Sequence, residues 1–295
     1  MLDLFTQSAP AFIAVIFAFA LVIGSFLNVV IHRLPIMMER EWREQCEELC
    51  KTPPEEQLPT GRFDLIAPRS RCPSCGQIIK AWQNIPVISY LLLGGQCANC
   101  KESISARYPL VELLTALLAA LCAWRFGVGW EATMAIVMTF ALVPISMIDA
   151  ETQLIPDSIV LPLMWIGLLM SLFHPVAASE TLFIAPRDAI VGAIAGYLSL
   201  WSVYQMFKLL TGKEGMGYGD FKLLAALGAW LGWQQLPTII LMSALVGAIV
   251  GISLMVFRNH ERSVPIPFGP YLAMAGWVTM LWGNTIKNTY LDLML

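Results

Sequence analysis

Long apolar runs, separated by short polar connections, repeat along most of the chain. A helix needs roughly 20 mostly apolar residues to cross the hydrocarbon core of a membrane. Runs close to that length predict about eight transmembrane helices. The runs lie near residues 10–31, 108–124, 130–148, 158–173, 188–207, 220–235, 237–257 and 268–286.

The first and sixth runs differ from the others. No Lys or Arg precedes residues 10–31, and this run is long enough to span a membrane. It is therefore predicted to be a retained helix and not a secretory signal. The sixth run, 220–235, is short and carries Lys222 near its start. We expect it to form either a full crossing or a re-entrant or tilted segment.

Composition supports the same class of protein. Hydrophobic residues make up 57% of the 295 residues, charged residues only 13%, and the mean hydropathy is +0.67. Soluble domains carry about 25% charged residues, so an ordinary soluble fold is excluded. The net charge of −3 gives no reason to expect a nucleic-acid partner. The predicted partner of the apolar surface is membrane lipid.

Basic residues set the predicted orientation, because cytoplasmic loops of membrane proteins are enriched in Lys and Arg. Residues 32–107 hold 10 of the 18 basic residues. If the N-terminus lies outside, this segment and most other basic residues are cytoplasmic, and both termini are outside. The chain then divides into a first span (1–31), a cytoplasmic loop domain (32–107) and a transmembrane core (108–295). The remaining inner basic residues are Lys208, Lys213, Lys222, Arg258 and Arg262, and the outer ones are Arg125, Arg187 and Lys287.

The loop domain contains two C-x₂-C pairs separated by 21 residues. Cys72, Cys75, Cys97 and Cys100 match the spacing of a structural Zn²⁺ site with four thiolates, and a small domain needs such a staple. Disulfides are disfavoured because the predicted compartment is reducing. Redox cysteines and unrelated thiols remain as alternatives. The predicted fold class is an all-α polytopic membrane protein with a small zinc-stapled cytoplasmic loop domain.

The other three cysteines are predicted to be plain thiols. Cys46 and Cys50 share one face of a charged helical pattern, EREWREQCEELCK, where they could bind a metal. A solvated helix with two free thiols is the simpler interpretation. Cys122 lies inside an apolar run and is expected only to pack.

Three acidic residues lie at the ends of predicted spans, where carboxylates are costly and count as functional candidates. Asp149 and Asp220 are 71 residues apart but are predicted to share one membrane depth. Two carboxylates about 3 Å apart cannot both ionise, so one keeps its proton. Such a dyad can take a proton from water and protonate a carbonyl oxygen, which is peptide hydrolysis. Asp157 follows Pro156 and is interpreted as ordinary helix-start chemistry.

Glycines alternate immediately before Asp220. Gly215, Gly217 and Gly219 are predicted to clear one edge of the turn, so that an extended substrate backbone can approach. In the competing interpretation, Asp220 caps a helix and the glycines only give a surface loop flexibility.

Taken in order, these features resemble the type IV prepilin peptidase family, the bifunctional leader peptidase/N-methyltransferases of bacterial pilus and type II secretion systems. The resemblance runs along nearly the whole chain. Besides the paired cysteines, it rests on GSFLNVVIHRLP (24–35), SARYPLVE (105–112), DAETQLIPD (149–157) and GYGD (217–220). The last segment is the G-x-G-D signature shared with presenilin-like intramembrane aspartyl proteases.

The resemblance implies an enzyme of the bacterial inner membrane with Asp149 and Asp220 as its catalytic pair. Residues 108–295 are then its peptidase core. The side on which both termini lie is then the periplasm, and the active site is at the cytoplasmic face. Prepilin and pseudopilin leaders are cleaved after a glycine. The new N-terminal residue, commonly Phe, is methylated with S-adenosylmethionine as donor.

The methyl-transfer site is the less defined part of this resemblance, because no Gly-rich nucleotide fold is recognisable. Gly95 and Glu112 are candidates, the latter for holding the substrate amine. An ion pair between Glu112 and Arg107 is the simpler interpretation of that carboxylate.

Two other functions fit part of the pattern. A transporter with intramembrane carboxylates predicts acids near the middle of the spans and two similar halves, and neither is found in the sequence. A peptidase without methyl transfer keeps the aspartate dyad and uses the zinc loop only for docking.

Overall fold

The computed structural model describes residues 8–50, 62–173, 184–213, 215–258 and 267–294. These residues divide into two compact units, Met1–Trp124 and Arg125–Leu295, which we describe separately. Throughout the described ranges the regular structure is helical. Extended pairing is limited to isolated bridges within residues 62–106, which hold the two cysteine pairs and which we call the cysteine segment. The all-α fold class is therefore confirmed.

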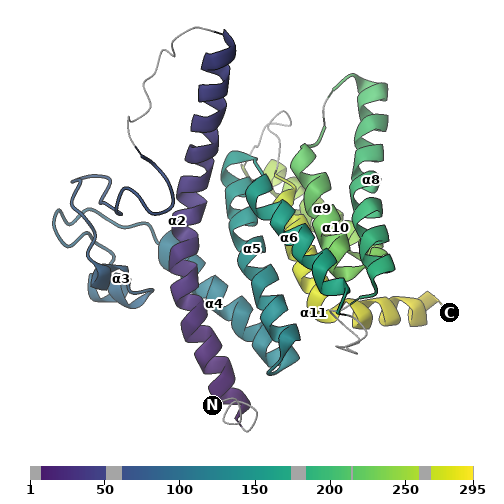
Figure 1. Ribbon diagram of the computed structural model, residues 1–295, viewed down its shortest axis with the longest axis horizontal. Helices are drawn as coiled ribbons and strands as arrows, with labels where there is room; N and C mark the ends of the chain where they lie inside the picture. Colours follow the sequence, from purple (N-terminus) through teal and green to yellow (C-terminus); the bar gives the residue numbers. More distant parts are fainter. Residues whose placement is uncertain (1–7, 51–61, 174–183, 214, 259–266, 295) are drawn as a thin grey trace. The chain divides into compact units, whose positions relative to one another are not determined.

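Unit 1 contains two long helices and the cysteine segment between them (Figure 1). Helix α2 spans Ala9–Cys50, and α4 spans Arg107–Phe126, ending just beyond the unit boundary. Between them lie a 3₁₀ turn, η1 (Ala81–Asn84), and the short helix α3 (Ile88–Leu92).

Helix α2 continues without interruption from the first apolar run into the charged pattern that contains Cys46. Pro35 lies inside it and cannot donate the usual backbone hydrogen bond, yet the helix extends to Cys50. The Cys46 thiol is free and exposed, whereas the side chain of Cys50 lies outside the described part. Arg262, used above for orientation, also lies outside the described residues.

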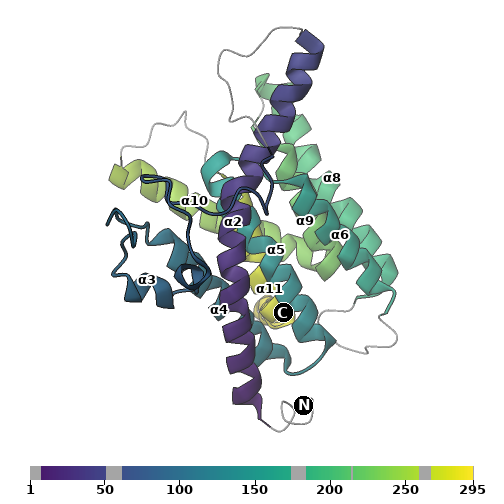
Figure 2. The same cartoon turned by 60° about the vertical axis from the view of Figure 1, so that its left-hand side comes forward.

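Unit 2 is a helical bundle (Figures 1 and 2). Its helices are α5 (Trp130–Thr152), α6 (Asp157–Ser171), α8 (Pro186–Thr211), α9 (Tyr218–Leu231), α10 (Leu236–Arg258) and α11 (Gly269–Met294), with a 3₁₀ turn, η2 (Trp233–Gln235), before α10.

Helix α9 forms the core of this bundle. Every residue from Asp220 to Leu231 except Lys222 is buried, and α6, α8, α10 and α11 all pack against it. The contact with α8 is backbone to backbone, because a Cβ atom on Gly192 would lie 2.2 Å from the Gly228 carbonyl oxygen. Small residues at such crossings are typical of helix packing in membranes, where van der Waals contact drives association.

Each of the eight predicted apolar runs falls mainly on one helix, although the sixth, 220–235, also includes η2, and α2 extends well past the end of the first run. By length and composition, α2, α4, α5, α8 and the stretch Trp233–Val256 are able to cross a membrane, and α6 is a shorter apolar helix. Helix α9 has 14 residues and is about 21 Å long, less than the roughly 30 Å of hydrocarbon. The number of complete crossings stays a prediction.

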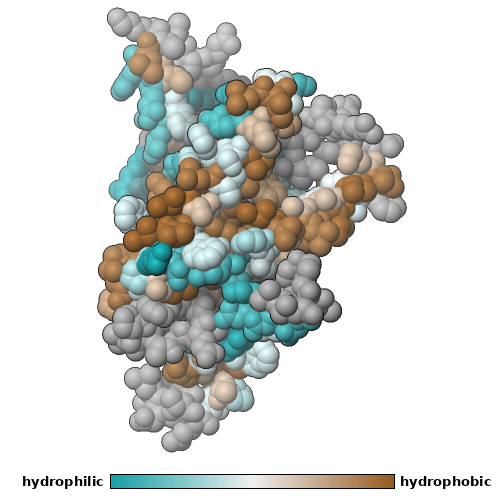
Figure 3. All heavy atoms as spheres, turned by 90° about the vertical axis from the view of Figure 1, so that its right-hand side faces the viewer, coloured by the Kyte–Doolittle hydropathy of each residue, from teal (hydrophilic) through white to brown (hydrophobic). Residues whose placement is uncertain are grey.

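The exterior of unit 2 is apolar where a lipid-facing surface is expected. Exposed Leu, Ile and Val side chains follow α8 and α10, and apolar residues cover much of the face shown in Figure 3. In α10 these exposed residues recur every three or four positions, so they share one face of the helix. They are Leu241, Leu245, Ile249, Ile252 and Val256.

Candidate functional site

The four cysteines of the paired motifs lie together in unit 1. The sulfur atoms of Cys72, Cys75, Cys97 and Cys100 all lie within 4.8 Å of one another, and the Cys72 and Cys100 sulfurs are 3.8 Å apart. A tetrahedral zinc site with Zn–S bonds of about 2.3 Å has sulfur–sulfur edges of about 3.8 Å. The geometry therefore fits a four-thiolate metal site.

The two cysteine pairs are built as matching turns. The backbone N–H of Cys72 donates to the carbonyl oxygen five residues later, and Cys97 does the same. Gly76 and Lys101, each four residues after those cysteines, donate back to their carbonyl oxygens with positive φ angles of 68° and 62°. Each turn points its backbone N–H groups at sulfur. Such bonds from Cys100, and then Asn99, lower the pKa of the Cys97 thiol to about 6.

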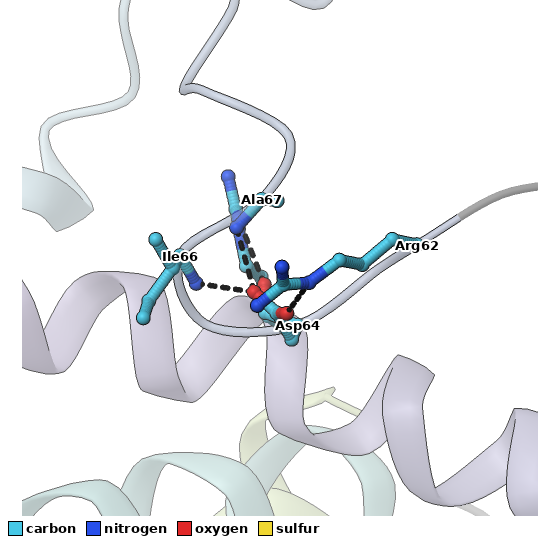
Figure 4. A network of polar contacts seen from close by, with 5 residues as sticks. Arg62, Asp64, Ile66 and Ala67 are labelled. Atoms are coloured by element: carbon cyan, nitrogen blue, oxygen red, sulfur yellow. Dashed lines mark hydrogen bonds and ion pairs between the residues drawn. The ribbon is translucent and has the colours of Figure 1, made fainter.

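A second polar cluster organises the residues just before the first cysteine pair (Figure 4). The Asp64 carboxylate accepts hydrogen bonds from the backbone N–H groups of Ile66 and Ala67, each at 2.7 Å, and from Arg62 Nε at 2.5 Å. The backbone N–H of Ala67, the Arg62 side chain and the N–H of Ile66 hold the pKa of Asp64 down at about 2. A fixed charge thus closes this turn.

Arg33 fastens this turn to helix α2. Its buried guanidinium donates to the carbonyl oxygens of Asp64 at 2.8 Å and Pro68 at 2.6 Å, and it lies 5.6 Å from the centre of the Phe63 ring. The segment that leads into the cysteine pair is therefore attached to the end of the first apolar run.

Asp149 lies near the end of α5 and is buried, with 5% of its surface exposed. Its Oδ2 atom accepts a hydrogen bond of 3.0 Å from the backbone N–H of Gly269, the first residue of α11. The first N–H groups of a helix have no partner within that helix, so they are free to hold a carboxylate. The start of α11 therefore fixes the orientation of Asp149.

Asp220 lies in the first turn of α9 and is also buried, with 7% exposed. Its Oδ1 atom has no hydrogen-bond partner among the described residues. Ile155 links the two carboxylates, although 71 positions separate them in sequence, because it lies against Gly219, the residue before Asp220, and against Gly269, which holds Asp149. Helix α11 packs against both α5 and α9, which explains how the two carboxylates are brought together.

Ile155 fills the space between the glycines on either side of this pair. A Cβ atom on Gly219 would lie 2.7 Å from Ile155 Cβ, and one on Gly269 would lie 2.9 Å from Ile155 Cδ1 and 2.6 Å from Asp149 Oδ2. Gly217 is different, because a Cβ there would meet only Asp220 Oδ2, at 3.9 Å. Of the three alternating glycines predicted to clear an edge for substrate, only Gly217 borders open space, while Gly219 packs against Ile155 and Gly215 against Phe207.

Asp157 and Lys222 form an ion pair close to Asp220. Lys222 Nζ lies 2.8 Å and 2.7 Å from the two carboxylate oxygens of Asp157, which is the first residue of α6. The pair joins the starts of α6 and α9. Sequence reasoning interpreted Asp157 only as helix-start chemistry and did not identify Lys222 as its partner.

Glu112 is buried in α4, and its Oε2 atom accepts a 2.8 Å hydrogen bond from the backbone N–H of Val87. Val87 has a positive φ angle of 57°, which is unusual for a β-branched residue. The carboxylate therefore holds a sharp bend just before α3. Gly95, the other candidate for methyl transfer, lies against Tyr90, since a Cβ atom there would be 3.0 Å from its hydroxyl oxygen.

Sequence reasoning missed Gly269 and Ile155. Gly269 acts through its backbone N–H and through the absence of a side chain, so no side-chain chemistry marks it. Its neighbours, in the segment PFGP, were the available signal, because proline on either side of a glycine marks a constrained chain direction change at a helix start.

Comparison with known proteins assigns the family. Residues 18–126 match the bacterial peptidase A24 N-terminal domain, and residues 135–252 match the type IV leader peptidase family. The chain belongs to the type IV leader peptidase family.

Curated relatives of this family match along nearly their whole length. A prepilin leader peptidase/N-methyltransferase of Pseudomonas aeruginosa is 53% identical over 292 residues, covering 99% of this chain and 98% of the relative. Proteins with the same name from Stutzerimonas stutzeri and Dichelobacter nodosus are 54% and 47% identical, covering 98% and 92% of this chain and 97% and 92% of the relatives. No solved structure matches the chain.

Proposed function

We propose that this chain is a membrane aspartic endopeptidase that removes the leader peptides of type IV prepilins and type II secretion pseudopilins. We further propose that it N-methylates the new N-terminal residue, with S-adenosylmethionine as donor. The observation that carries the proposal is the buried pair Asp149 and Asp220, linked through Ile155 and Gly269, in a chain whose relatives bear the name of this bifunctional enzyme.

The two aspartates divide the work of hydrolysis. Gly269 holds one oxygen of Asp149, and the unpartnered Oδ1 of Asp220 is available to water or to the substrate. With one proton shared by the pair, the ionised carboxylate takes a proton from the attacking water. The other carboxylic acid protonates the carbonyl oxygen of the scissile bond, and the tetrahedral intermediate then expels the amine as it gains a proton.

The leader substrate reaches the pair beside Gly217. An extended peptide brings its own backbone against the carboxylates, and the open side of Gly217 is the place where such an approach meets no Cβ atom. On the predicted orientation this opening is at the cytoplasmic face of the bacterial inner membrane, with both termini periplasmic. Gly219 and Gly269 contribute through the absence of a side chain, which lets Ile155 pack close to the carboxylates.

The four-thiolate site is proposed to hold structural Zn²⁺. Its four sulfurs leave no position for a reacting water, so the metal would supply folding stability to the cysteine segment and no catalytic step. The thiolate ligands would be Cys72, Cys75, Cys97 and Cys100.

No step of methyl transfer is assigned to Gly95 or Glu112. The Glu112 carboxyl group is engaged by the Val87 N–H and by the Ser25 side chain, and Gly95 packs against Tyr90. Both residues thus have a contact within the protein that accounts for them, and methyl transfer is proposed without assigned residues.

Cleavage of a purified prepilin by the purified chain tests both activities in one reaction. With labelled S-adenosylmethionine present, we expect a product shortened at the glycine and carrying one methyl group on its new N-terminus. Cleavage without label on the product would support a peptidase alone. Absence of cleavage by folded protein would contradict the proposed enzyme and favour the alternative function, a transporter.

A further inference from the structure

The cysteine segment carries an exposed apolar surface on η1 and α3, which we call the α3 apolar face. It consists of Trp82, Ile85, Ile88, Leu91 and Leu92, whose exposed fractions are 50%, 44%, 54%, 71% and 77%. Five large apolar side chains exposed within eleven residues are unusual for a small domain surrounded by water. The feature needs either a partner or a different solvent.

The bend before α3 is fixed to a membrane helix. The Val87 N–H donates to Glu112, which is the sixth residue of α4. Figures 1 and 2, which share a vertical axis, show α3 level with the beginning of α4 and far from the C-terminal end of α2. The α3 apolar face is therefore not carried away from the spans at the tip of the loop domain.

The length of α4 gives the depth of this attachment. Helix α4 has 20 residues and is about 30 Å long, so it needs its whole length to cross the hydrocarbon core. The Cα atom of Glu112 lies five residues beyond Arg107, about 7 Å along the axis. Because helical side chains point toward the N-terminus, the Glu112 carboxylate and Val87 lie a few ångströms nearer the headgroups.

Helix α2 gives a second, independent measure. A Cβ atom on Gly24 would lie 2.8 Å from the Cα of Glu112, so the two helix backbones touch at this level. Gly24 precedes the end of the first apolar run, residue 31, by seven residues, or about 10 Å. Both helices thus place the attachment point at or inside the boundary of the hydrocarbon core.

We propose that η1 and α3 form an interfacial anchor whose apolar face inserts among the lipid headgroups and upper acyl chains of the inner leaflet. At this depth the exposed Leu and Ile side chains meet acyl chains, and Trp82 takes the interfacial position typical of that side chain. The exposed Lys80, one residue before η1, is available to anionic headgroups. The segment predicted as a cytoplasmic loop would then be held to the membrane at three places: α2, α4 and this anchor.

Site-specific photocrosslinking tests the proposal in the full-length protein. A benzophenone amino acid is placed at Leu92, and the purified, zinc-loaded protein is reconstituted in nanodiscs that contain a labelled phospholipid. The matched negative control is Ser74, which is exposed at the tip of the first cysteine turn, and the positive control is Leu117, which is 53% exposed on α4. We expect lipid labelling at Leu92 close to that at Leu117 and about tenfold above that at Ser74.

Labelling at Leu92 no higher than at Ser74 would overturn the anchor. The same holds if the Leu92 probe crosslinks to an added prepilin or to a second copy of the chain in place of lipid, since the apolar face would then be a protein-docking surface. Leader cleavage is measured on the same samples, so a failure of the anchor is distinguished from a failure of the peptidase.

A substitution without a bulky probe gives an independent check. Brominated lipids quench Trp fluorescence on contact, and the difference between the wild type and Trp82→Phe isolates the contribution of Trp82. We expect that contribution to be quenched by lipids brominated near the headgroup. An unquenched contribution, with metal content and cleavage unchanged, would place Trp82 in water and contradict the proposal.

Discussion

The two units use polar side chains in opposite ways. In unit 1 the four sulfurs come from two short motifs, and local backbone turns aim each pair, as at Cys72 and Cys97. In unit 2 the two carboxylates come from helices far apart in the chain, and the packing of α11 and α6 against both α5 and α9 brings them together. A local motif can specify a metal site almost alone, whereas the aspartate pair exists only if a whole bundle folds.

The largest effect on activity is expected from removing one of the two buried carboxylates of unit 2. Asp149→Asn and Asp220→Asn should each lower leader cleavage by about 10³-fold or more, because the amide cannot take or supply the catalytic proton. Initial rates of prepilin cleavage by purified protein measure the loss.

Asp157→Asn is the matched control for these variants, since it removes an exposed carboxylate from the same end of the bundle. It should stay within a few-fold of the wild type. Activity of either buried variant within tenfold of the wild type would mean that the pair does not carry hydrolysis.

A smaller loss is expected from crowding the start of α11. In Gly269→Ala the new methyl group would lie 2.6 Å from Asp149 Oδ2 and 2.9 Å from Ile155, so the carboxylate must move. A displacement of that kind costs about 10²-fold in rate when it disturbs a reacting geometry. The readout is the rate of cleavage at saturating prepilin.

Gly247→Ala provides the comparison variant, because its methyl group would meet the Tyr271 ring at 3.3 Å and neither aspartate is among its nearest neighbours. Equal losses in the two variants would show general disruption of the bundle. A loss confined to Gly269→Ala would show that the Gly269 backbone positions Asp149.

The difference between a site built from local motifs and a site built by helix packing explains what the sequence could predict. The apolar runs predicted every long helix, because lipid demands continuous apolar length whatever the helix packs against. The cysteine cluster followed from spacing. The convergence of Asp149 and Asp220 could be proposed from their shared depth, but the backbone donor Gly269 and the wedge Ile155 could not, since neither carries a reactive side chain.

Glu112 shows the same limit in unit 1. Its position in an apolar run marked it as a costly carboxylate that needs a partner. The partner is the backbone N–H of Val87, 25 residues earlier, in a bend whose positive φ angle no residue type announced. Hydrogen bonds to backbone groups of remote segments leave little trace in a sequence.

Removal of a thiolate should affect metal binding in unit 1 much more than leader cleavage by unit 2. In Cys72→Ser we expect bound zinc to fall from about one ion per chain to nearly none, because a three-thiolate site loses most of its affinity. The cysteine segment should become sensitive to limited proteolysis. The aspartate pair lies in the other unit, so cleavage should fall less than in either aspartate variant.

Cys46→Ser is the control, since Cys46 is free and exposed on α2. Metal content by atomic emission is the deciding measurement. Zinc retained at the wild-type level in Cys72→Ser would remove Cys72 from the metal site.

The smallest effect is expected from the ion pair that joins α6 to α9. The side chains of Lys222 and Asp157 are 32% and 53% exposed, and pairs of this kind contribute only about 0–1 kcal/mol to stability. Lys222→Ala should therefore lower the cleavage rate only a few-fold, by loosening the start of α9 two residues from Asp220.

In a double-mutant cycle with Asp157→Asn, the two losses should not add, because each variant removes the same contact. Lys213→Ala, an exposed lysine on the preceding turn, should be silent. Fully additive losses for Lys222 and Asp157 would show that Lys222 acts on the substrate or the aspartate pair and not through Asp157.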